Sequence, residues 1–127
     1  MKLFTVFASL SGLTAVLLGA FGAHALKGKL TPELLSAYET GVQYQLWHTL
    51  ALLAVCALMH FSPSAKLLNF SAYLFMLGIV LFSGSLYILA TTSLRDIGVI
   101  PIGIITPIGG LCFIAGWLLL TTHFIKQ

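Results

Sequence analysis

Four apolar stretches occupy most of the 127-residue sequence and constrain its fold more than any other feature. They cover residues 3–23, 42–61, 67–90 and 106–124, and none of them contains an Asp, Glu, Lys or Arg. The hydrocarbon core of a bilayer is about 30 Å thick, which a helix crosses with about 20 residues. Each stretch is therefore long enough to cross a membrane, and the sequence predicts an integral membrane protein.

The composition excludes a soluble domain and a nucleic-acid-binding protein. Charged residues make up 7% of the chain and hydrophobic residues 59%. Three acidic and six basic side chains cannot cover the surface of a soluble domain of this length. The basic residues are scattered and form no stripe that would bind nucleic acid. We expect a single all-α domain, an antiparallel four-transmembrane-helix bundle surrounded by membrane lipids.

An even number of spans places both termini on one side of the membrane, here called side A. The loops at residues 26–41 and 91–105 then lie on the opposite side, side B. Lys and Arg number three on each side, so the positive-inside rule gives no preference. The amino group of Met1 adds one positive charge to side A and favours a cytoplasmic location for it.

The first stretch has some features of a secretory signal peptide. Lys2 precedes the apolar run, and Ala23-His24-Ala25 resembles a cleavage site. The run of about 20 residues exceeds the 7–15 residues of a typical signal peptide. We therefore expect it to remain as the first transmembrane helix.

The first side-B loop contains a helix start at Thr31-Pro32-Glu33. Thr can cap a helix, Pro suits its first position, and Glu favours the positive end of the helix dipole. We expect a short amphipathic helix at about 32–40, lying at the membrane surface and bending into the second span near Gly41.

The second side-B loop is apolar between residues 97 and 103 but is interrupted by Pro and Gly. We expect this segment to lie along the membrane surface, and Thr106 to cap the last span. Aromatic residues near the ends of the spans are expected to form belts at the two membrane surfaces. These are Tyr44, Trp47 and Tyr87 towards side B, and Tyr73 and Trp117 towards side A.

Small residues recur at helical spacing in the first, third and fourth spans. Small side chains let helices approach closely, which is a main source of helix association in lipid. We interpret them as contacts within the bundle; the alternative is an outward-facing stripe that forms a homo-oligomer. The expected helix-packing glycines are Gly12, Gly19, Gly22, Gly78, Gly109 and Gly116.

His48 is an ionisable side chain within the second span, roughly 9 Å below the side-B boundary at 1.5 Å per residue. At 100° per residue it shares a helix face with Tyr44 and Gln45, whereas Glu39 and Gln43 point to the opposite side. Because burial in lipid is costly for such a group, His48 should face the bundle interior. It is either a proton relay, ligand or polar gate, or a neutral histidine hydrogen-bonded to Tyr44, Gln45 or a neighbouring helix.

His24 ends the first span on side B and could approach His48 only if the helix frays there. Two histidines without a third ligand do not define a zinc or copper site. Cys56 and Cys112 have no CxxC or His cluster around them and are expected to be free thiols. We expect no metal and no cofactor. The candidate functional polar cluster consists of His24, Glu39, Gln43, Tyr44, Gln45 and His48.

The sequence contains no HExxH, GxSxG, GxGxxG or P-loop motif, so we assign no catalytic residue. The apolar spans contain no carboxylate, which argues against a carboxylate-based proton pump. The two halves of the chain show no repeat of the kind found in many transporters.

Four segments, at residues 19–26, 39–48, 81–87 and 106–110, are similar to motifs of a known family. They read GAFGAHAL, ETGVQYQLWH, LFSGSLY and TPIGG. Through them the whole chain resembles domain-of-unknown-function family 423, which comprises small bacterial inner-membrane proteins and a human transmembrane counterpart.

The resemblance implies a four-span protein of the bacterial inner (cytoplasmic) membrane and implies no activity. It makes His24, Glu39, Gln43 and His48 the first residues to test. Three functions remain open. The first is a non-enzymatic accessory or scaffold that associates with lipid or with a membrane-protein complex. The second is a small oligomeric channel or transporter with a polar path at His48, Tyr44 and Gln45, and the third is a metal or haem site at His24 and His48.

Overall fold

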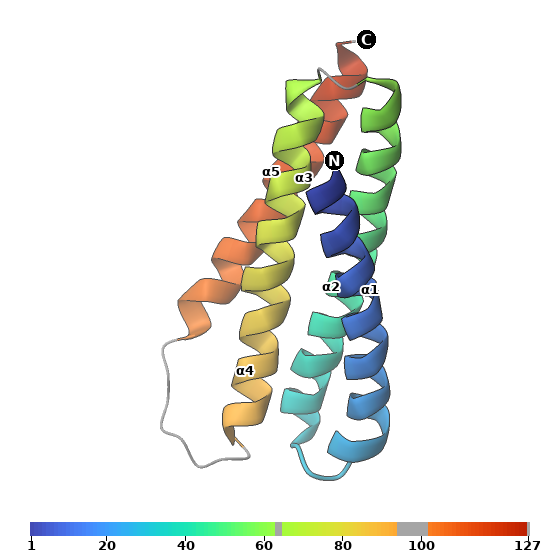
Figure 1. Cartoon of the computed structure of the whole chain (residues 1–127). Coiled ribbons are helices and arrows are strands. Elements are labelled where there is room, and N and C mark those ends of the chain that lie inside the picture. The colour runs from blue at the N-terminus through green and yellow to red at the C-terminus, as the bar shows by residue number, and fades with distance from the viewer. Residues whose placement is uncertain (63–64, 94–101, 127) are drawn as a thin grey trace.

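The computed structural model describes residues 1–62, 65–93 and 102–126 of the chain, and nearly all of these residues are helical (Figure 1). The third span is one continuous helical rod that begins at Lys66 and ends at Ser93. The elements are α1 (Lys2–Phe21), η1 (Gly22–Leu26), α2 (Pro32–Phe61), α3 (Lys66–Gly78), η2 (Ile79–Ser83), α4 (Gly84–Ser93), η3 (Ile102–Ile104) and α5 (Ile105–Ile125).

Four helices have the length and apolar composition needed to cross a membrane: Lys2–Leu26, Pro32–Phe61, Lys66–Thr92 and Ile105–Ile125. Successive helices run in opposite directions, so that α1 begins and α5 ends towards the same end of the bundle (Figure 1). The predicted all-α membrane fold with four spans is confirmed.

The expected short helix at 32–40 is helical, but it forms the first turns of α2 and is not a separate element. Thr31 caps the helix as predicted, since its side chain accepts a hydrogen bond from the backbone of Leu34. The helix α2 continues without interruption through Gly41, which lies against Tyr87 of α4. The connection between the first two spans is therefore much shorter than the sequence suggested.

The expectations for the second side-B loop have two outcomes. Residues 94–101, which include most of the expected surface segment, lie outside the described part of the chain. The prediction that Thr106 caps the last span is wrong. The last helix, α5, begins at Ile105, and the Thr106 hydroxyl lies 2.6 Å from the hydroxyl of Ser85 on α4.

Helix α2 lies between α1 and the third span. It packs against α1 along much of its length and against α3, η2 and α4 on another side. Helix α5 packs mainly on α3 and η2, and it reaches α2 through aromatic side chains around His48. The core between these helices is apolar, and its most deeply buried members include Leu52, Val55, Leu68, Ala72 and Phe75.

The six glycines expected to pack between helices each lie against a residue of a neighbouring helix. Three of them are on the first span and three join the third span to α5. The closest approach to a neighbouring backbone is on α5, where the space for a side chain at Gly109 is occupied by the backbone of η2. The pairs are Gly12 with Thr49, Gly19 with Val42, Gly22 with Tyr38, Gly78 with Phe113, Gly109 with Phe82 and Gly116 with Phe75.

Candidate functional site

Gln45 is a buried hydrogen-bonding centre that joins three helices. Its side-chain NH₂ group donates to the backbone oxygen of Ser11 and to the hydroxyl of Thr14 on α1, both at 2.9 Å. Its side-chain oxygen accepts a hydrogen bond of 2.6 Å from the hydroxyl of Tyr87 on α4. The amide therefore uses both of its donor hydrogens and its acceptor inside the bundle.

Further hydrogen bonds extend this contact along α2, and we call the whole set the polar seam. The hydroxyls of Ser11 and Thr49 lie 2.6 Å apart between α1 and α2. The set also includes the bond from Tyr38 to the Leu18 carbonyl and the bond from Ser83 to the Gly41 carbonyl. Among the described residues, no buried side-chain oxygen or nitrogen lacks a hydrogen-bond partner. The polar seam is a closed set of partners and not an open path.

His48 faces a different interface, between α2 and α5. Its ring is stacked on Phe113, with ring centroids 3.5 Å apart, and only 6% of the residue is exposed. The ring nitrogen Nδ1 lies 2.8 Å from the backbone oxygen of Tyr44, and the indole N–H of Trp117 donates to Nε2 at 3.1 Å. Both ring nitrogens therefore have a partner.

These two hydrogen bonds define the form of the His48 ring. An indole N–H can only donate, so Nε2 of His48 must be an acceptor without a proton. A backbone carbonyl can only accept, so the proton of the ring is on Nδ1. His48 in this structure is a neutral imidazole that links α2 to α5, and neither of its nitrogens is free for a metal.

Beside His48, the two helices leave an open cleft of about 370 Å³. Its hydroxyl-bearing residue is Tyr44, whose ring is stacked on Phe82 with centroids 4.6 Å apart. The Tyr44 hydroxyl makes no hydrogen bond to any described residue. We call this space the aromatic cleft, and it is lined by Tyr44, Trp47, His48, Gly110, Phe113, Ile114 and Trp117.

The remaining members of the predicted polar cluster lie elsewhere. Glu39 and Gln43 are exposed and line a separate groove of about 210 Å³ between α1 and α2, beside Gly19 and Gly22. His24 is exposed in η1, where the neighbouring Gly22 contacts Tyr38 of α2.

The structure does not bring His24 and His48 together. Gly22, two residues before His24, contacts Tyr38 of α2. Tyr38 is ten residues from His48, or about 15 Å along a helix. Among the described residues, no group of three or more His, Cys, Asp or Glu side chains could hold a metal ion.

Sequence reasoning missed the residues that complete both sites. Trp117 and Tyr87 were expected in the aromatic belts, but the indole of Trp117 binds His48 and the hydroxyl of Tyr87 binds Gln45. Phe113, which stacks on His48, was not singled out. The only signal was its spacing, because Gly109, Phe113 and Gly116 recur on one face of α5.

Comparison with known proteins places the chain in a family. The family model described as "Protein of unknown function (DUF423)" matches residues 18–110. The chain belongs to the DUF423 family. The match includes all of α2, and with it Gln45, His48 and Tyr44. Membership in DUF423 confirms the resemblance found in the sequence and assigns no activity to the chain.

Members of this family resemble the chain over nearly its whole length. A UPF0382 membrane protein of Staphylococcus haemolyticus is 46% identical over 126 residues, covering 99% of this chain and 98% of the relative. YwdK of Bacillus subtilis is 40% identical over 99% of this chain and 98% of its own. YgdD of Escherichia coli K12, described as an inner membrane protein, is 41% identical over 95% of this chain and 88% of its own. No solved structure matches the chain.

Proposed function

We propose that this DUF423 protein is a non-enzymatic accessory component of the bacterial inner membrane that binds a lipid-like amphiphile in the aromatic cleft. The observation that carries the proposal is the contrast within α2. The side chain of Gln45 is bonded to partners within the bundle, whereas Tyr44, one residue away, lines the cleft, and its hydroxyl has no hydrogen-bond partner among the described residues.

The size and lining of the aromatic cleft support a small molecule as the occupant. Binding sites for small ligands commonly measure about 300–1,000 Å³ and are lined by apolar and aromatic groups with a few polar ones. The cleft, at about 370 Å³, is at the lower end of this range. The apolar part of an amphiphile would lie against Phe113 and Ile114. An acceptor atom of the same molecule would accept a hydrogen bond from the hydroxyl of Tyr44.

The polar seam supports this role over a channel. A polar path would need side chains that can exchange their partners for water or ions. Gln45 points to α1 and α4 and is fully bonded, whereas His48 points to α5. The two residues therefore do not line one common path within a subunit. Their partners support a structural role for Gln45 and, for His48, a role as part of the lining of the aromatic cleft.

Native mass spectrometry of the protein, extracted in a mild detergent, tests the proposal. We expect the wild-type protein to carry a reproducible adduct with the mass of a lipid or other amphiphile. Gly110→Leu places a large side chain in the cleft and should remove at least about nine-tenths of this adduct, since the space for it is filled.

The matched control is Gly84→Leu, at a glycine of α4 with no atom of another residue near the added Cβ. This variant should keep the adduct at the wild-type level. The absence of any adduct from the wild-type protein would contradict the proposal. So would an equal number of bound amphiphiles per chain in Gly110→Leu and in the wild-type protein.

A further inference from the structure

A second recess lies at side A, around the beginning of α1. Two adjoining cavities, of about 460 and 390 Å³, both contain Met1 and His60 in their walls. The helix α1 begins below the last turn of α2, so that the ends of α2 and α3 extend beyond it (Figure 1). The recess is therefore a space above α1 that these two ends border.

The walls of this recess carry polar groups that have no hydrogen-bond partner among the described residues. Lys2 lies on one side of it, and Asn69 of α3 on the other. Neither the side-chain amide of Asn69 nor a ring nitrogen of His60 makes a hydrogen bond to a described residue. An ammonium group, an amide NH₂ and an imidazole N–H are all donors, which suits an acceptor-rich ligand.

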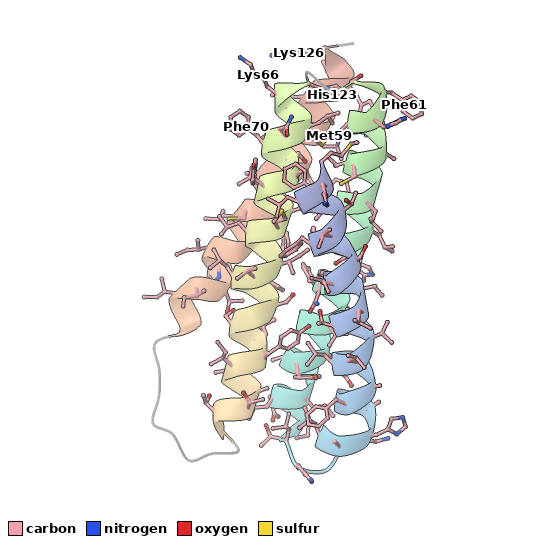
Figure 2. All side chains as sticks on the ribbon, in the orientation of Figure 1. Met59, Phe61, Lys66, Phe70, His123 and Lys126 are labelled. Atoms are coloured by element: carbon pink, nitrogen blue, oxygen red, sulfur yellow. The ribbon has the colours of Figure 1, made fainter. Side chains whose placement is uncertain are left out.

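The charge at this end of the bundle favours an anion. Figure 2 shows Lys66 and Lys126 at this end of the bundle, at the beginning of α3 and the end of α5. The acidic side chains in the described part of the chain are Glu33 and Glu39, which lie in the first turns of α2 at the opposite end. The positive charge of Lys2 is thus not offset by a carboxylate at this end among the described residues.

Below its polar groups the recess is apolar. Its wall continues along α2 through Ala57 to Leu53, which is 40% exposed, nearly two turns from His60. A ligand that fits the whole recess has an anionic head at side A and an apolar chain directed towards the middle of the bundle. This shape is that of a phospholipid and not of a free anion.

We propose that the recess formed by Lys2, His60 and Asn69 binds the phosphate of an acidic glycerophospholipid. Lys2 supplies the charge, His60 and Asn69 donate hydrogen bonds to the phosphate oxygens, and an acyl chain lies along Leu53. This site is separate from the aromatic cleft and stands on different residues, so either proposal can fail alone.

The test is a titration of the purified full chain in detergent with short-chain phosphatidylglycerol or phosphatidylcholine, followed by native mass spectrometry. We expect the wild-type protein to bind the acidic lipid about fivefold more tightly, as one basic group near a membrane surface provides. Lys2→Gln should remove this preference. His60→Ala should weaken binding of the acidic lipid without lowering the thermal stability of the protein.

The matched control is Lys126→Gln, which removes a positive charge from the same end but outside the recess. It should retain the fivefold preference. Equal binding of the two lipids by the wild-type protein would overturn the proposal, as would an equal loss in Lys126→Gln and Lys2→Gln. Inorganic phosphate at millimolar concentration should not displace phosphatidylglycerol, and displacement would overturn the assignment of a lipid as the occupant.

Discussion

The polar seam and the aromatic cleft both border α2, yet they use their polar groups in opposite ways. In the polar seam, Gln45 binds Ser11, Thr14 and Tyr87, so that donors and acceptors are matched. In the aromatic cleft, the Tyr44 hydroxyl has no partner among the described residues, and the helices on either side leave an open space.

This difference separates polar groups that hold the bundle together from polar groups that are available to a ligand. Within lipid no water competes for a hydrogen bond, so unmatched groups are costly and matched groups stabilise the packing. A hydroxyl that remains unmatched beside an open space is therefore a better indicator of function than a buried polar side chain as such. His48 illustrates the point, because its depth suggested a functional role and its two partners explain it structurally.

The largest loss of stability is expected on the side of α5 that packs against η2, rather than on the side that borders the open aromatic cleft. At Gly109, an added Cβ would lie 2.8 Å from the Cα of Phe82, a backbone atom that cannot move aside. We expect Gly109→Ala to lower the free energy of unfolding by roughly 1–3 kcal/mol, measured by unfolding in detergent followed by circular dichroism. Gly110→Ala, on the open side of α5, should be neutral or slightly stabilising. Equal losses in both variants would show that α5 has no open side.

The next largest loss of stability is expected in the polar seam. Gln45→Leu removes three hydrogen bonds and leaves the Tyr87 hydroxyl unmatched, so the free energy of unfolding should fall by about 2 kcal/mol. Gln43→Leu is the matched control, since Gln43 is exposed two residues away on the same helix. It should leave the midpoint of thermal unfolding in detergent unchanged. If Gln45→Leu were equally harmless, the polar seam would not stabilise the bundle.

The smallest loss of stability is expected for the hydrogen bond from Trp117 of α5 to His48 of α2. Trp117→Phe removes the indole N–H that binds His48, and an interhelical hydrogen bond in a membrane protein contributes about 0.6 kcal/mol. Trp47→Phe is the control, because its indole makes no hydrogen bond to a described residue. The free energy of unfolding, measured by chemical unfolding, should be measurably lower for Trp117→Phe than for Trp47→Phe. The reverse order would mean that His48 is not held through Trp117.

The sequence was sufficient for the fold because span length and apolar composition are local properties. Residues 3–23 and 42–61 contain no charge, and each forms the greater part of one helix. The cap at Thr31 was predictable for the same reason, since its partner is three residues away.

The partners of the polar residues depend on contacts between distant parts of the chain. Trp117 and His48 are 69 residues apart, and no local pattern indicates that they meet. Thr106 shows the error that local reasoning produces: its hydroxyl suits a helix cap, but a hydroxyl on Ser85, 21 residues away, is its partner. The open side of α5 also depends on how that helix lies against α3, which the sequence of α5 alone does not encode.

Photolabelling with a phospholipid that carries a diazirine on its acyl chain tests the central claim most directly. Ile114 of the aromatic cleft and Leu13 of α1 are equally exposed, at 58% and 57%, so bulk lipid should label them alike. If an acyl chain is held in the cleft, Ile114 should carry several-fold more label than Leu13, and Gly110→Leu should lose this excess. Equal labelling of the two positions in the wild-type protein would contradict the account.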